Sequence, residues 1–470
     1  MTTTQVTPQG TIGNLTPDQE AKLRELWVLT AKVCGIKAEA LDQDAEQQKA
    51  PQSPPQEKKT RRRYTWFGKA YDEPVDDAAS TTSANGAASS LASLSIADAD
   101  DKYGQSKEFK QTLDEMTPEE IRTTFWNMVK HDHPDALLLR FLRARKWDVK
   151  KALIMLISTI RWRLLELKVD DDVMKNGEAL ARKQVESSDP GQKKAGEEFL
   201  AQLRMGKTFL HGVDKAGRPI CVVRVRLHRS SDQSDKTMER LTVFTIETAR
   251  LMLVPPVETA TIVFDMTNFT LANMDYMPVK FIIKCFEANY PECLGNILIH
   301  KAPWIFSGIW NIIKGWLDPV VAGKVHFTKN VDELENYIPR EQIMKELEGD
   351  EDWEYKYPEF KAGENKAMED TAKRDDLIGQ RQEVARELES ATMEWIMACR
   401  QDNKDVIPGT KKKRSDLIEK LRAQYWDLDA YVRARSLYDR NNVIQPGGKI
   451  DFYPAPSKAN GTNGDASGSK

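Results

Sequence analysis

The chain has 470 residues, of which 30% are charged and 40% hydrophobic, and its net charge is −3. This composition is typical of a globular protein with more than one domain, and the charge balance argues against a dedicated nucleic-acid-binding protein. The first residues show neither a basic nor an apolar segment, so we expect no secretory signal. No run of about 18 apolar residues lacks a polar interruption, so we expect no transmembrane helix. The five scattered cysteines contain no CxxC pair and are typical of reduced thiols in a cytosolic protein.

Residues 1–36 contain one predicted helix, since Thr16, Pro17 and Gln19 have the spacing of a helix start with a capping box. Residues 37–110 are rich in Pro, Gln, Ala and Ser, and we expect disorder because such a segment buries too little apolar surface. Its basic and aromatic run "KKTRRRYTWFGKAY" indicates membrane contact, a partner site, an import signal or a solvated linker, and these alternatives stay open.

Residues 111–170 form a predicted helical unit. Thr117 and Glu120 have the spacing of a second capping box, and Asp148 is the expected cap of a later helix. That helix has one apolar stripe, which predicts packing against another element and consists of Val149, Leu153, Leu156 and Ile160.

Residues 171–350 change to an α/β pattern. Strands are predicted at 207–211, 219–227, 259–266, 296–302 and 324–328, with helices between several of them. In the second strand, alternation places Cys221, Val223, Val225 and Leu227 on one face, and Arg224 and Arg226 on the other. Strand–helix–strand alternation favours parallel neighbours and an α/β layered fold.

Residues 351–455 form a predicted helical extension, and residues 456–470 a disordered tail. A 3-4-3-4 apolar spacing in the second long helix predicts a hairpin that packs against the main domain or a partner; its members are Ile418, Leu421, Tyr425, Leu428 and Val432. The basic run at 411–414 indicates membrane contact or nuclear import.

The sequence carries no catalytic signature. HExxH, GxSxG and Walker patterns are missing, and His131 and His133 are two positions apart, so they do not share a helix face. We therefore expect no enzyme activity, no metal site and no cofactor.

One segment is far more apolar than the rest of the chain, from Ile305 to Leu317. A buried core helix explains its periodicity. However, Gly308 and Gly315 each cost a helix about 1 kcal/mol relative to alanine, and Pro319 follows an abrupt helix end. A helix between weak points can swing, and one that is apolar nearly all round then needs two apolar environments. A lipid-filled cavity and a membrane surface supply them.

Several motifs, in this order, resemble the CRAL-TRIO lipid-binding domain family: "LLLRFLRARKWDVKKALIML", "DKAGRPI", "IVFDM" and "YPECLGNILIHKAPWIFSGIWNIIKGWLDPVVAGKV". The resemblance covers about residues 117–350 and is closest to fungal phosphatidylinositol transfer proteins. It implies a helical N-terminal region, a cavity domain with a mixed, largely parallel sheet, and a mobile gate helix at Ile305–Leu317. The gate and cavity residues would be Phe306, Ile309, Trp310, Ile313, Trp316 and Leu317, with hinges at Gly308, Gly315 and Pro319.

The resemblance also implies a site for the phosphoinositol headgroup at Arg145, Glu292 and Lys324. A phosphate removed from water needs fixed cations, and inositol hydroxyls need an acceptor such as a carboxylate. On the cavity floor, Ala260 and Ile262 stand where members that carry phosphatidylcholine have hydroxyl side chains, which argues against choline lipids.

Together these features predict a cytoplasmic carrier of phosphatidylinositol that touches membranes transiently, with the endoplasmic reticulum, Golgi or lipid droplets as candidates. The bound phospholipid would be its ligand. The alternatives are a carrier of a sterol or another lipid, and a lipid-regulated sensor or adaptor. In that last case a lipid kinase or another protein would bind the helices of Thr371–Arg440.

Overall fold

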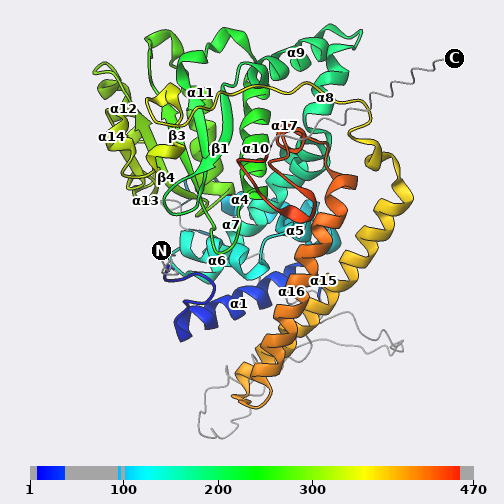
Figure 1. Cartoon of the computed structure of the whole chain (residues 1–470). Helices are drawn as coiled ribbons and strands as arrows, with labels where there is room; N and C mark the ends of the chain where they lie inside the picture. Colours follow the sequence, from blue (N-terminus) through cyan, green and yellow to red (C-terminus); the bar gives the residue numbers. More distant parts are fainter. Residues whose placement is uncertain (1–7, 37–93, 97–100, 456–470) are drawn as a thin grey trace, which may run out of the picture.

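The computed structural model describes residues 8–36, 94–96 and 101–455 (Figure 1). The basic and aromatic run and the predicted C-terminal tail lie outside these residues. Part of the segment 37–110, which was predicted to be disordered, is ordered: helix α4 begins at Gln105, and the preceding residues 101–104 are also described.

The N-terminal helices form one packed unit. They are α1 (Pro17–Val33), α4 (Gln105–Glu115), α5 (Pro118–Val129), α6 (Pro134–Ala144) and α7 (Val149–Arg161). Both predicted capping boxes are present at Thr16 and Thr117, and the Asp148 side chain caps α7. The predicted stripe of α7 is buried in the core of this unit, as its spacing indicated.

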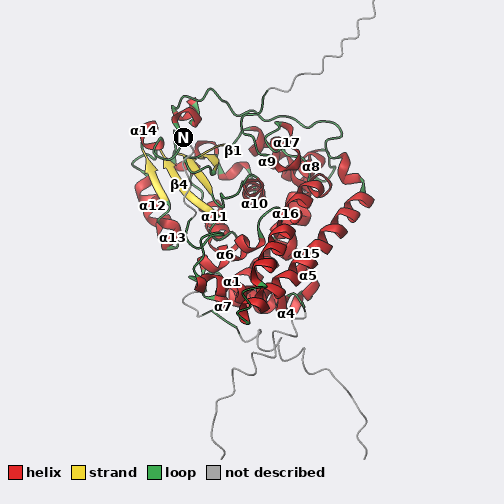
Figure 2. Ribbon diagram, turned by 60° about the horizontal axis from the view of Figure 1, so that its bottom comes forward, coloured by secondary structure: helices red, strands yellow, loops and turns green. Residues whose placement is uncertain are grey.

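A five-stranded sheet forms the second part, with the strands side by side in the order β1-β2-β3-β4-β5 (Figure 2). The strands are β1 (Thr208–Val213), β2 (Pro219–Arg224), β3 (Ala260–Asp265), β4 (Leu294–His300) and β5 (Val325–Thr328). Only the β1–β2 pair is antiparallel, so the predicted mixed, largely parallel sheet is confirmed.

The second strand is shorter than predicted. It ends at Arg224, and residues Val225–Leu227 form a 3-10 turn, so the alternation of faces stops there. Arg224 and Arg226 both bind Glu346, which lies far along the chain, and Arg226 also pairs with Asp265. These ion pairs hold the chain in a turn that the local alternation does not reveal.

Helices connect the strands and complete the layers. Two π-helical turns, η2 (Trp162–Glu166) and η3 (Val169–Met174), lead into α8 (Lys175–Val185) and α9 (Pro190–Arg204). Helix α10 (Asp235–Leu251) precedes β3, and α11 (Tyr276–Lys284) with the π-helical turn η7 (Cys285–Asn289) precedes β4. The short segments α12 (Phe306–Lys314), α13 (Pro319–Ala322) and α14 (Val331–Leu334) lie together at one edge of the molecule (Figure 1).

The C-terminal extension is the predicted helical hairpin, made of α15 (Thr371–Arg400) and α16 (Ile407–Val432) and followed by α17 (Leu437–Arg440). It packs against the N-terminal helices, opposite the edge that carries α12 (Figure 1). Trp395 and Ile396 of α15 belong to the same hydrophobic core as α1, α5, α6 and α7. Ile418 and Leu421 of the predicted stripe are buried between α15 and α16.

Candidate functional site

A polar pocket of about 380 Å3 lies between the N-terminal helices and the segment that follows α12, and the three predicted headgroup residues all line it. Arg145 is the residue after α6, Glu292 lies between η7 and β4, and Lys324 directly precedes β5. The Nζ atom of Lys324 lies 3.4 Å from Oε2 of Glu292, and both side chains are half-buried. The fold therefore brings together a guanidinium, a carboxylate and an ammonium group from three distant segments.

The backbone at Glu292 has an unusual conformation. Its φ of 55° lies in the left-handed region, which residues other than glycine rarely adopt. Such conformations cost free energy and gather at functional sites, where the surrounding structure holds them in place. This geometry marks Glu292 independently of its sequence motif.

The sequence did not reveal part of this pocket. Lys102 and Tyr103 line it from the segment expected to be disordered, and both donate hydrogen bonds of 2.7 Å to Oε2 of Glu287 in η7. Lys102 also donates to the carbonyl of Trp316, and Oε1 of Glu287 accepts from the backbone N–H of Asp318 at 2.6 Å. Burial and the bond to Glu287 raise the pKa of Tyr103, so it stays a donor.

An apolar cavity of about 190 Å3 adjoins the polar pocket. It lies between α11, α12 and one face of the sheet, which contributes Ile262, Phe264, Ile297 and Ile299. The two hollows share four lining residues: Phe286, Leu294, Leu317 and Val321. A ligand that spans both would therefore have a charged or polar end and an apolar body.

The predicted gate segment is helical over Phe306–Lys314, slightly less than Ile305–Leu317. Four of its six predicted residues line the apolar cavity: Phe306, Trp310, Ile313 and Leu317. Ile309 is buried beneath the helix but does not line the cavity, and Trp316 lines the polar pocket instead.

The predicted hinges lie in α12, directly after it and at the start of α13. Gly308 is inside α12, with open space where a Cβ would be, and Gly315 directly follows the helix. Gly315 and Pro319 both line the polar pocket. Neither glycine has a positive φ, so the backbone does not require glycine here, and a hinge role stays a prediction.

Only one of the two predicted floor residues faces the cavity. Ile262 lines it, whereas Ala260 does not. Simple alternation along a strand would place both side chains on the same face of the sheet. The pairing between β3 and β4 shifts its register between these two positions, so that alternation is interrupted at Ala260.

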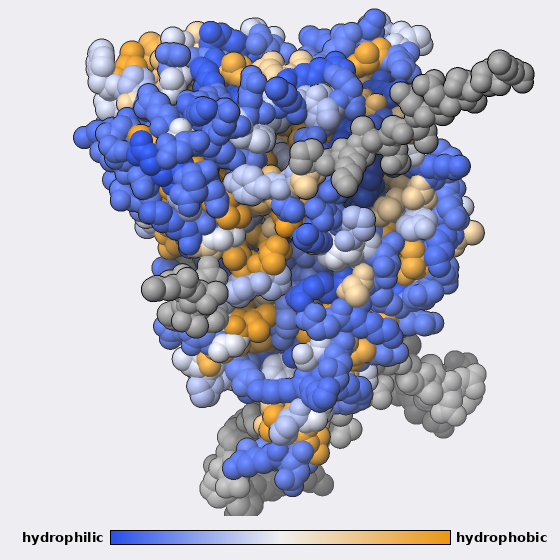
Figure 3. All heavy atoms as spheres, viewed as in Figure 1, coloured by the Kyte–Doolittle hydropathy of each residue, from blue (hydrophilic) through white to orange (hydrophobic). Residues whose placement is uncertain are grey.

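Large apolar side chains are exposed around α12. Trp304 is 86% exposed just before the helix, and Ile312 on it is 49% exposed. Neighbouring elements add Tyr276, whose ring contacts Trp316, and Phe327, whose ring contacts Trp310. Elsewhere, the face in Figure 3 is mainly hydrophilic, with hydrophobic residues gathered between its upper left part and the lower helices.

Two features are absent from the residues that the structure describes. Among those residues, no group of three or more His, Cys, Asp or Glu side chains is arranged to hold a metal ion. None of the helices described there is long and apolar enough to cross a membrane.

Two family models match the chain, the CRAL/TRIO domain over residues 203–349 and the CRAL/TRIO N-terminal domain over residues 105–158. The chain is 48% identical to the CRAL-TRIO domain-containing protein C3H8.02 of Schizosaccharomyces pombe over 332 residues, which are 71% of this chain and 70% of that protein. The chain therefore belongs to the CRAL-TRIO family, as its motifs indicated.

Other relatives are named for lipid transfer. The phosphatidylinositol transfer protein CSR1 of Eremothecium gossypii is 38% identical over 453 residues, 94% of this chain and all of that protein. The phosphatidylinositol/phosphatidylcholine transfer protein SFH12 of Arabidopsis thaliana is 29% identical over 239 residues, 47% of this chain and 38% of that protein. These names describe carriers and no catalytic activity, in agreement with the expectation that the chain is not an enzyme.

Proposed function

We propose that the protein carries phosphatidylinositol between membranes, with the headgroup in the polar pocket and the acyl chains in the apolar cavity. The observation that carries this proposal is the junction of the two hollows through four shared residues. Arg145 and Lys324 supply the cations that a buried phosphate needs, and Glu292 supplies an acceptor for inositol hydroxyls. The CSR1 relative is named as a phosphatidylinositol transfer protein, which supports the same ligand.

The cavity volume supports a moving gate. An apolar cavity of about 150 Å3 holds one benzene molecule, so about 190 Å3 is too small for two acyl chains. Helix α12 forms one wall of the cavity and has exposed apolar side chains on its outer side. Its outward movement would enlarge the cavity and place Trp304 and Ile312 on a membrane surface.

The energetics explain why a carrier is needed. Exposing acyl chains to water costs about 0.8 kcal/mol for each CH2 group, so spontaneous transfer of a two-chain lipid is negligibly slow. A closed cavity removes this cost during transit through the cytoplasm. No covalent step is required.

One observation favours a second candidate, a sterol or a similarly apolar lipid. At one of the two positions where family members that carry phosphatidylcholine have hydroxyl side chains, the cavity wall has Ile262. A compact, almost wholly apolar ligand would fill such a cavity with fewer polar contacts than a phospholipid makes.

Mass spectrometry of lipids extracted from the purified protein tests the proposal. We expect stoichiometric phosphatidylinositol in the native protein and its loss in the double variant Glu292→Gln/Lys324→Met. The matched control is Glu354→Gln/Lys356→Met. It removes an exposed ion pair of 3.6 Å whose two residues line neither the polar pocket nor the apolar cavity. Phosphatidylinositol that persists in the first variant would contradict the headgroup site, and a bound sterol would establish the second candidate.

A further inference from the structure

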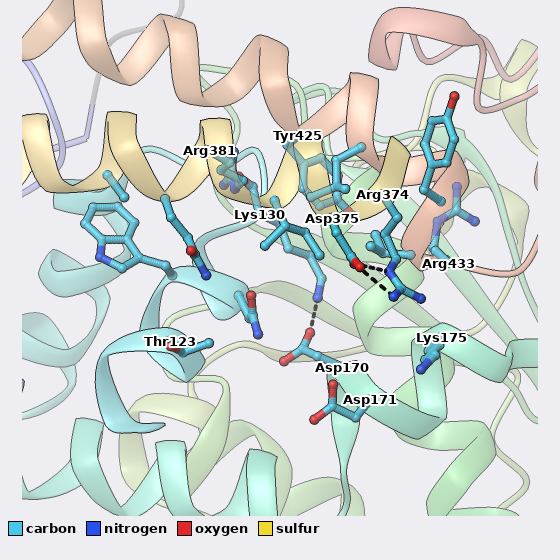
Figure 4. Close-up of a pocket in the computed structure, with 18 of the residues that line it drawn as sticks. Thr123, Lys130, Asp170, Asp171, Lys175, Arg374, Asp375, Arg381, Tyr425 and Arg433 are labelled. Atoms are coloured by element: carbon cyan, nitrogen blue, oxygen red, sulfur yellow. Dashed lines mark hydrogen bonds and ion pairs between the residues drawn. The ribbon is translucent and has the colours of Figure 1, made fainter. Parts of the chain in front are cut away.

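A third pocket, of about 420 Å3, lies beneath the C-terminal hairpin (Figure 4). Its walls come from α5, from the π-helical turn η3 and from both hairpin helices, α15 and α16. It shares no lining residue with the polar pocket or the apolar cavity. We call it the hairpin pocket.

Basic side chains outnumber acidic ones in the walls of the hairpin pocket, and most of them are already neutralised. Lys130 on the floor binds Asp170 and Glu247, and Arg374 binds Asp375 (Figure 4). Two further arginines of the lining also have carboxylate partners: Arg122 with Glu389, and Arg433 with Asp429 and Asp439. These pairs build the pocket but leave no charge for a ligand.

Arg381 is different, because it is buried and has no carboxylate partner among the residues that the structure describes. It is 8% exposed, and its guanidinium donates to the backbone carbonyls of Leu421 and Lys130. Burial lowers its pKa to about 10, so it keeps its charge at neutral pH. Backbone carbonyls satisfy hydrogen bonds but do not cancel a full positive charge.

Two more lining cations, Lys175 and Arg386, have no ion pair within the described residues. The lining acid without such a pair is Asp171. These three cations outnumber Asp171, although Arg122 has a second carboxylate partner in the lining, Glu119. Together they suit a phosphate monoester, which carries about −1.5 to −2 at pH 7.

Most of the uncharged lining is apolar or aromatic and includes Trp126, Ile378, Tyr425 and Tyr431, with Thr123, Asn127 and Gln382 as its polar members. Rings of this kind stack on planar groups and cover apolar ones, whereas arginine and lysine hold phosphate oxygens. We propose that the hairpin pocket binds a phosphate monoester that also has an apolar or aromatic part.

Occupancy would brace the hairpin, since α5 and η3 contribute one side of the pocket and α15 and α16 the other. A ligand that binds only the folded, docked arrangement stabilises it according to its concentration and affinity. The site does not depend on the identity of the lipid in the cavity.

Isothermal titration calorimetry on the full chain tests the proposal with phenyl phosphate, and with inorganic phosphate as the comparison. We expect saturable binding of phenyl phosphate, weaker binding of inorganic phosphate, and roughly tenfold weaker binding of phenyl phosphate to Lys175→Met/Arg386→Met. Both substituted side chains are exposed and without an ion pair, so the variant is expected to fold. Lys404→Met, on the exposed turn of the same hairpin, is the matched control and should bind like the native protein.

A second variant separates this site from the headgroup site. Lys324→Met should bind phenyl phosphate normally, and a loss of binding there would assign the phosphate to the polar pocket and overturn the proposal. So would an absence of binding at millimolar phenyl phosphate, or equal affinity in the native protein and Lys175→Met/Arg386→Met. Vesicles of phosphatidylcholine with and without phosphatidic acid distinguish the two sources of the phosphate. If the protein binds only the vesicles with phosphatidic acid, and Lys175→Met/Arg386→Met weakens that binding, the ligand is a lipid headgroup. If the protein binds phenyl phosphate but neither kind of vesicle, the ligand is soluble.

Discussion

Lys207 is a buried lysine without a carboxylate partner in the described part of the chain. It is 3% exposed, its Nζ donates to Oε1 of Gln233 at 2.8 Å, and it lies 3.4 Å from Nδ1 of His228. Its side chain also contributes to the wall of the apolar cavity. Burial lowers the pKa of Lys207 from 10.5 to about 8. The charged form is therefore less stable in the folded protein than in the unfolded chain.

This shift predicts that Lys207→Met stabilises the protein at pH 7, by about 1–3 kcal/mol in the free energy of unfolding. Below pH 8 the native lysine is charged in both states, so the full cost of burying its charge is present. Between about pH 8 and 10.5 the folded state has lost the proton that the unfolded state keeps, so the native protein becomes more stable as the pH rises.

Urea denaturation at pH 7 and pH 10 measures this difference. The advantage of Lys207→Met should shrink at the higher pH. Lys215→Met, at an exposed position nearby in sequence, should show neither effect. A substituted protein that is less stable than the native one at pH 7 would show that the bonds to Gln233 and His228 outweigh the cost of burial.

At the scale of the elements, local patterns predicted what local forces determine. The caps at Thr16, Thr117 and Asp148 depend on side chains within three residues, and each is where the sequence placed it. The buried stripe of α7 likewise follows from helical periodicity alone. By contrast, the end of β2 depends on Glu346, more than 100 residues away, and no local pattern contains that information.

The sequence likewise indicated some residues of the candidate site and not others. Arg145, Glu292 and Lys324 were predicted because they stand in recognisable motifs; they line one pocket, and their role in headgroup binding stays a prediction. Lys102 and Tyr103 were missed because their acceptor, Glu287, lies more than 180 residues away and their own surroundings have a low-complexity composition. A long-range hydrogen bond leaves no periodicity in the sequence.

Glu287 connects the N-terminal segment that contains Lys102 and Tyr103 to the residues after α12. Its carboxylate accepts from Lys102 and Tyr103 on one side and from the backbone of Asp318 on the other. Its side chain is only 6% exposed, whereas that of Lys102 is 47% exposed, so water screens their ion pair only in part. These bonds hold the segment after α12 against η7, in the arrangement that keeps the cavity small.

We expect Glu287→Gln to loosen this connection and to accelerate opening of α12 roughly tenfold, since a charge-assisted hydrogen bond contributes about 1.5–3 kcal/mol. Hydrogen–deuterium exchange of the amides of Phe306–Lys314 measures opening directly, whatever lipid is bound. Glu335→Gln, which removes an exposed partner of Arg340, is the control and should exchange at the native rate. Unchanged exchange in Glu287→Gln would show that other contacts hold the gate segment.

At the scale of the whole molecule, the hairpin is attached to the N-terminal helices by buried charges as well as by apolar packing. Asp135 in α6 accepts 2.7 Å hydrogen bonds from Arg414 in α16 and from the indole of Trp27 in α1. Arg414 also lies over the ring of Trp395 in α15, 4.4 Å from its centroid. One carboxylate thus joins three parts of the chain, including the extension that the family models do not cover.

Removing the charge of Asp135 should therefore destabilise the whole protein. In Asp135→Asn the guanidinium of Arg414 would stay buried without a counter-ion, which costs about 3–5 kcal/mol. Burial by itself would raise the pKa of Asp135, but Arg414 holds it below its usual value. The folded state therefore favours the ionised form, and the contribution of Asp135 is lost as the pH falls below about 4.

Urea denaturation at pH 7 and at about pH 3 measures both effects, and the difference between Asp135→Asn and the native protein should be smaller at the lower pH. Asp416→Asn is the matched control, because it removes the exposed partner of Lys412 on the same helix and should change the free energy of unfolding by less than about 1 kcal/mol. If Asp135→Asn unfolds at the native midpoint and α15 and α16 exchange their amide hydrogens at the native rate, apolar packing alone attaches the hairpin. If the midpoint is native but α15 and α16 exchange faster while the sheet does not, the pair holds the hairpin locally without contributing to global stability.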